Sequence, residues 1–68
     1  MTEYVVIYER GDDGWGVYSP DLAVFTHGDT RDEAEANIRE AIKLHLAHLR
    51  SEGREPPQQA SSIGVVAV

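Results

Sequence analysis

The strongest constraint on the fold of this chain is one long helical pattern between residues 30 and 52. On a wheel of about 100° per residue, one apolar stripe collects Ala34, Ile38, Ala41, Ile42, His45 and Leu49, with Leu46 at its margin. Most charged residues of the segment lie off that stripe. The pattern predicts a single amphipathic helix of roughly 20 residues, about 30 Å long, whose apolar stripe must pack on another element.

Both ends of the predicted helix carry capping residues. Thr30 can cap the first turn with its hydroxyl, and Glu33 can reach back to accept from the Thr30 backbone N–H. Gly53 supplies a C-terminal stop. A helix start can also bind phosphate, but the acids at this one repel an anion, so we interpret Thr30 and Glu33 as structural.

Three short strands are predicted before the helix. Glu3–Glu9 is rich in β-branched and aromatic residues, and a hairpin loop at Gly11–Gly14 follows it. Trp15–Ser19 then returns as the second strand. Pro20 ends that strand because it cannot donate to a ladder, and Val24–His27 forms the third. The first part of the chain is therefore expected to be a meander.

After the helix, Ile63–Val68 is predicted to be a fourth, well-buried strand. A strand that follows a helical crossover most simply lies parallel to a strand of the meander, with a right-handed connection. We therefore expect one α+β domain over residues 1–68, ordered βββαβ. Its mixed sheet of four strands has the order 3-2-1-4, with the helix on one face and apolar side chains on the open face.

The small size of the chain predicts self-association. A chain of 68 residues buries only about 60% of its unfolded surface, and this one has no cysteine for a disulfide. Oligomerisation is then the expected source of extra stability. Candidate contacts between copies are Tyr4, Val6, Tyr8 and Trp15. Trp15 fits a core position equally well.

Charge restricts the partners. The formal net charge is −6, which repels a nucleic-acid backbone and favours a basic protein. Asp12, Asp13 and Asp21 stand on predicted loops, where they either face such a partner or only form solvated turns. The chain has no basic leader and no apolar run of roughly 18 residues, so we expect a soluble, cytoplasmic protein without a membrane contact.

No residue pattern predicts catalysis or a cofactor. His45 and His48 lie one helical turn apart, and His27 could approach them, but no thiolate or carboxylate is placed with them by its spacing. No serine, cysteine or paired carboxylate accompanies His27 as a nucleophile or base. We therefore expect no catalytic residue, no metal site and no cofactor.

The order of several short motifs resembles a known family. PDL, a short apolar segment, GDT, RDEAEANIREAI, LHLAHLRSEG, a PP pair and a final apolar strand are similar to the N-terminal domain of HicB-like antitoxins. The resemblance implies an antitoxin that masks the active site of a HicA-like toxin, a small double-stranded-RNA-binding fold that cleaves mRNA with a histidine. It also implies a degenerate ribonuclease-H-like fold. Acids stand only at the ends of the first strand, so we expect no nuclease activity.

Two departures from the family pattern bear on these expectations. Family members usually read PDLPG, whereas Ala23-Val24 replaces the Pro-Gly pair and the segment is one residue shorter, so the corner should differ in shape. HicB antitoxins also commonly continue into an operator-binding domain, whereas this sequence ends at Val68. We therefore expect no direct contact with nucleic acid.

Two functions remain open from the sequence. The first is neutralisation of a toxin, which the resemblance and the acidic charge favour. The second is a non-catalytic oligomeric accessory or small-ligand-binding domain without a DNA-binding module. A basic protein encoded beside this gene would distinguish them.

Overall fold

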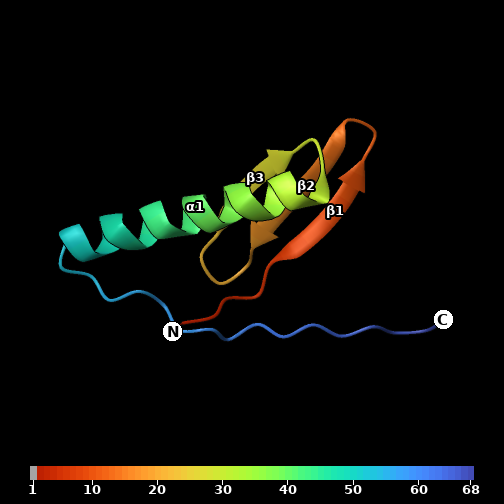
Figure 1. Cartoon of the computed structure of the whole chain (residues 1–68). Helices are drawn as coiled ribbons and strands as arrows, with labels where there is room; N and C mark the ends of the chain where they lie inside the picture. The colour runs from red at the N-terminus through yellow and green to blue at the C-terminus, as the bar shows by residue number, and fades with distance from the viewer. Residues whose placement is uncertain (1) are drawn as a thin grey trace.

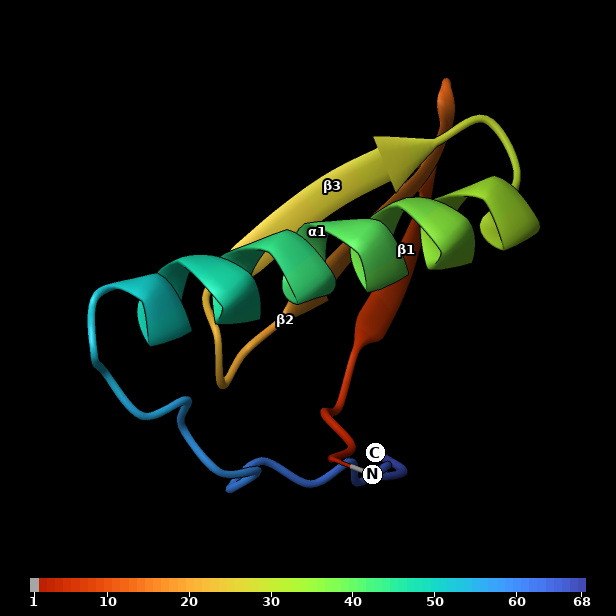
Figure 2. The same cartoon turned by 60° about the vertical axis from the view of Figure 1, so that its left-hand side comes forward.

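The computed structural model describes residues 2–68 and contains three strands followed by one helix. The strands β1 (Ile7–Gly11), β2 (Gly14–Ser19) and β3 (Val24–Gly28) form an antiparallel sheet in the order β1-β2-β3. The helix α1 (Arg31–Ser51) crosses one face of this sheet, over β3 and β2 (Figures 1 and 2). The predicted α+β class and the meander are confirmed.

The first strand begins later than predicted, at Ile7 rather than Glu3. Ile7 pairs with Tyr18, so the same register would place Val5 opposite Pro20. Proline has no N–H to donate, so the β1–β2 ladder cannot continue toward the N-terminus. At its other end, β1 extends past Glu9 to Gly11, and its ladder runs to the hairpin turn.

The start and end of α1 follow from local capping. The Thr30 hydroxyl accepts a hydrogen bond from the Glu33 backbone N–H at 3.1 Å, and the Glu33 carboxylate accepts from the Asp29 N–H at 3.0 Å. Glu33 therefore reaches one residue further back than expected. At the other end Gly53 has a φ of 72°, and the Arg54 N–H donates to the Leu49 carbonyl at 2.9 Å, as in a Schellman motif.

The buried core lies between α1 and the middle of the sheet. Its central cluster consists of Val17, Ala34 and Ile38, and Leu22 and Leu49 are also buried. The helix comes so close to β3 that a Cβ added at Gly28 would lie 2.4 Å from the Ala34 backbone nitrogen. The Asn37 side chain also donates to the His27 carbonyl at 2.8 Å. Only glycine fits at position 28, so this residue sets the distance between helix and sheet.

The predicted fourth strand and the order 3-2-1-4 are not seen in the structure. Within residues 2–68 the sheet has three strands, and residues 63–68 form an extended segment without ladder pairing. This C-terminal segment runs away from β1 instead of beside it (Figure 1). Ser61 anchors the crossover to Asp21 in the β2–β3 turn, and beyond that anchor the segment diverges from β1. The β1 edge therefore has no strand beside it.

Candidate protein-interaction surfaces

The two faces of the sheet differ in what covers them. On the helix side, Val6, Tyr8 and Trp15 pack against the core cluster. On the opposite side the ladder aligns Ile7, Tyr18 and Phe25 in one row across the three strands. We call this the open row. Phe25 is 69% exposed, and its ring lies against Gly16, where an added Cβ would meet it at 3.4 Å.

The four residues predicted to join copies of the chain all have contacts within the chain. Val6, Tyr8 and Trp15 border the core, and the Arg31 guanidinium lies over the Tyr8 ring at 4.1 Å. The Tyr4 hydroxyl donates to the Pro57 carbonyl at 2.5 Å. Their part in an interface between copies stays a prediction.

The three acids predicted to face a partner lie at opposite ends of β2. Asp12 and Asp13 are exposed at the tip of the β1–β2 hairpin, whereas Asp21 lies in the β2–β3 turn. Because β3 runs back toward the hairpin, the start of α1 lies at the hairpin end as well, with Asp29 and Asp32. We call the end carrying these four aspartates the acidic end.

Asp21 differs from Asp12 and Asp13 in its hydrogen bonds to a distant part of the chain. Its carboxylate accepts from the Ser61 hydroxyl at 2.8 Å, from the Ser61 N–H at 3.1 Å and from the Ala60 N–H at 3.2 Å. These bonds, led by that of the Ser61 hydroxyl, lower the pKa of Asp21 below its ordinary value despite partial desolvation. Asp21 ties the chain to itself across 40 residues, which no sequence motif indicated.

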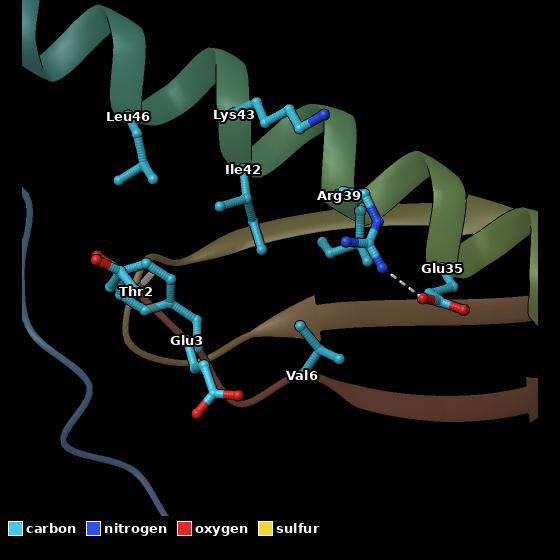
Figure 3. Close-up of a pocket in the computed structure, with 10 residues that line it drawn as sticks. Thr2, Glu3, Val6, Glu35, Arg39, Ile42, Lys43 and Leu46 are labelled. Atoms are coloured by element: carbon cyan, nitrogen blue, oxygen red, sulfur yellow. Dashed lines mark hydrogen bonds and ion pairs between the residues drawn. The ribbon is translucent and has the colours of Figure 1, made fainter.

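An open groove of about 600 Å³ lies between α1 and the N-terminal segment (Figure 3). Val6, Ile42 and Leu46 point into it, and Glu3, Glu35, Arg39 and Lys43 line its polar parts. The Arg39 guanidinium bonds the Glu35 carboxylate at 2.7 Å. The groove therefore leaves apolar side chains at the margin of α1 uncovered.

The described residues hold neither a metal cluster nor a membrane span. No three histidine or acidic side chains among residues 2–68 are grouped to bind a metal ion. His48 lies 3.5 Å from the Glu52 carboxylate on the exposed side of α1. No helix in that part of the chain combines the length and apolar character that a bilayer span requires.

Comparisons with known proteins find two similar sequences and one family. The chain is 36% identical over 56 residues to an uncharacterized 14.9 kDa protein from the rep-hol intergenic region of Haemophilus phage HP1. That match covers 81% of this chain and 42% of the phage protein. This chain is also 36% identical over 58 residues to a UPF0150 protein of Thermoplasma acidophilum. That second match covers 82% of this chain and 84% of the Thermoplasma protein.

No solved structure gives a significant match. The sequence profile described as "HicB_like antitoxin of bacterial toxin-antitoxin system" matches residues 4–67, which is nearly the whole chain. This chain therefore belongs to the HicB-like antitoxin family.

Proposed function

We propose that this protein is the antitoxin of a toxin–antitoxin pair and neutralises a HicA-like, mRNA-cleaving toxin by covering its active site. The observation that carries the proposal is the family match over residues 4–67. In this proposal the chain acts in the cytoplasm, by binding alone and without chemistry of its own.

Charge supports a toxin as the partner. A protein that holds RNA must present basic groups to the phosphates, and this chain carries a net charge of −6. The acidic end places Asp12 and Asp13 on an exposed hairpin tip, where they can attract a basic surface. Opposite charges of this kind raise the association rate more than the final affinity.

The open row supports a contact surface beside the acidic end. Phe25 and Tyr18 offer aromatic area on the sheet face that α1 leaves uncovered. Exposed aromatic side chains are frequent energetic anchors of protein interfaces. We place the toxin over this face and the hairpin tip, and we assign Asp21 to the closure of the chain instead.

Charge reversal tests the proposed contact. The double change Asp12→Lys and Asp13→Lys should slow association with the toxin, most steeply at low salt, because it replaces attraction by repulsion. The matched double control, Glu40→Lys and Glu55→Lys, changes the net charge equally on exposed sites away from the acidic end. Stopped-flow or surface-based kinetics at several salt concentrations measure both variants.

A cell-based experiment tests the function itself. The product of the gene adjacent to the one for this chain is expressed alone and together with this chain, and growth and complex formation are followed. Rescue of growth and a stable complex are expected. If the neighbour is harmless and does not bind, the antitoxin proposal fails and the accessory-domain alternative replaces it. If both charge variants slow association equally, the contact with the toxin does not lie at the acidic end.

A further inference from the structure

The C-terminal segment, residues 63–68, has strand-forming residues but no partner within its own copy. Ile63, Val65, Val66 and Val68 are all large, apolar and exposed, between 72% and 122%. Apolar residues occupy both alternating faces of the segment, which is typical of a strand covered on both sides. Water around such a segment is unfavourable, so the segment is suited to enter another sheet.

The β1 edge offers the matching unpaired backbone. β1 pairs only with β2, so its outer N–H and C=O groups have no ladder partner among the described residues. Tyr4–Val6, just before it, is rich in strand formers and half-buried, yet Pro20 prevents β2 from pairing with it. A strand added outside β1 would supply the missing partner to both stretches.

The groove beside α1 marks the same edge as incomplete. α1 lies over β3 and β2, so the groove of about 600 Å³ opens between Val6 and the margin of the helix. Alternate side chains of a strand added at β1 would lie over its apolar residues, Val6, Ile42 and Leu46. A single added strand would therefore cover both unpaired backbone and uncovered apolar surface.

The path of the segment favours a second copy as its acceptor. The bonds from Ser61 and Ala60 to Asp21 bring residues 62–64 near the start of β1, but a second opening of about 560 Å³ remains between them. The end of the segment diverges from β1 (Figure 1), and its large apolar side chains are exposed. Val65 and Val68, at 94% and 122% exposure, are free to reach another molecule.

We infer that two copies of this chain exchange their C-terminal segments, each adding residues 63–68 as a strand to the β1 edge of the other. Burying four large apolar side chains per copy, together with the surface that they cover, amounts to on the order of 1,000 Å² for the pair. That area is near the lower limit for a specific dimer. The exchange rests on the chain alone and does not depend on the proposed toxin.

Cross-linking between separately labelled chains tests the exchange directly, since the protein has no cysteine of its own. The single variants Val5→Cys and Val66→Cys, one carrying a mass tag, are mixed in denaturant, refolded together and treated with a short bis-maleimide. A mixed dimer is the expected product. In the control, Ala36→Cys on the exposed side of α1 replaces Val5→Cys, and no mixed dimer should form.

The double variant distinguishes exchange from closure within one chain. Val5→Cys with Val66→Cys in the same chain should cross-link into dimers. If it cross-links only within monomers, and the mixed single variants do not join, the segment pairs with its own β1 and the inference is wrong.

A charge in the segment gives an independent readout. Val66 is 83% exposed within its own copy, so Val66→Asp should leave the helical circular dichroism unchanged. It should shift the mass by light scattering at low micromolar concentration from twice 7.5 kDa to 7.5 kDa. Gln58→Asp, on the exposed linker, should remain dimeric. A Val66→Asp dimer, or a monomeric parent chain, overturns the exchange without affecting the toxin proposal.

Discussion

At the scale of single residues, the turn after β2 contains an unfavourable backbone conformation. Ala23 has a φ of 56°, the only positive φ of a non-glycine residue among residues 2–68. The left-handed region costs a residue with a Cβ roughly 1–2 kcal/mol. Ala23 lies in the PDLAV corner, where the resemblance to HicB-like antitoxins implied a Pro-Gly pair, and the chain turns through alanine instead.

Glycine at this position should stabilise the protein. Ala23→Gly removes the strain, but it also gives the unfolded chain more conformational freedom, which lowers the free energy of unfolding by about 0.4–1 kcal/mol. We expect a net gain of up to about 1 kcal/mol in the free energy of unfolding, measured by urea denaturation. Ala36→Gly, inside α1 and exposed, is the control and should lose about 1 kcal/mol. A loss at both positions would mean that residue 23 does not hold a positive φ in solution.

At the scale of elements, α1 is defined by its caps and by its close approach to β3. The Thr30 hydroxyl accepts from the Glu33 N–H, which the first turn leaves free, and the Glu33 carboxylate accepts from the Asp29 N–H just before the cap. Since Gly28 comes two residues before the cap and touches the backbone of α1, the corner sets the helix direction as well as its first residue.

Removing the N-terminal cap should weaken the whole fold. Thr30→Ala leaves the Glu33 N–H without its acceptor and should cost about 1 kcal/mol in the free energy of unfolding. Glu33→Ala should cost less, because the Asp29 N–H that it bonds is exposed and can bind water. Thr30→Ser retains the hydroxyl and serves as the control. Unchanged denaturation midpoints for Thr30→Ala would place the helix start elsewhere.

At the scale of the whole molecule, the chain is held together by a small core and by a few long-range bonds. Among residues 2–68 the buried apolar side chains are those of Val17, Leu22, Ala34, Ile38 and Leu49, which is a small core for a chain of 68 residues. The bonds from Tyr4 to Pro57 and from Ser61 to Asp21 close the chain around the sheet. These bonds also fix where the C-terminal segment leaves the molecule, and so which edge it can reach.

The Asp21 closure should depend on pH. Because the folded pKa of Asp21 lies below its ordinary value of 3.8, the closure contributes stability that is fully present above that value. This contribution is lost as the pH falls through the folded pKa. The Ser61 amide resonance should therefore titrate together with the Asp21 carboxyl, with a midpoint below pH 3.8. Asp21→Asn is the control and should abolish the Ser61 titration; a Ser61 signal that titrates unchanged in that variant would contradict the closure.

The sequence by itself determined the elements whose signals are local. Helix periodicity, the Thr30 cap, the Gly53 stop and the hairpin all arise from interactions between residues a few positions apart, so they could be predicted closely. The open row of Ile7, Tyr18 and Phe25 was not predicted, although strand alternation and the hairpin register would have indicated it.

Only the tertiary structure decided the contacts between distant parts of the chain. The start of β1 depends on the register that sets Pro20, just after β2, opposite Val5, and the role of Asp21 depends on Ser61, 40 residues later. The position of residues 63–68 depends in turn on that closure. Such contacts form only when chain closure brings distant backbone groups together, and a short apolar run predicts a strand without saying which edge receives it.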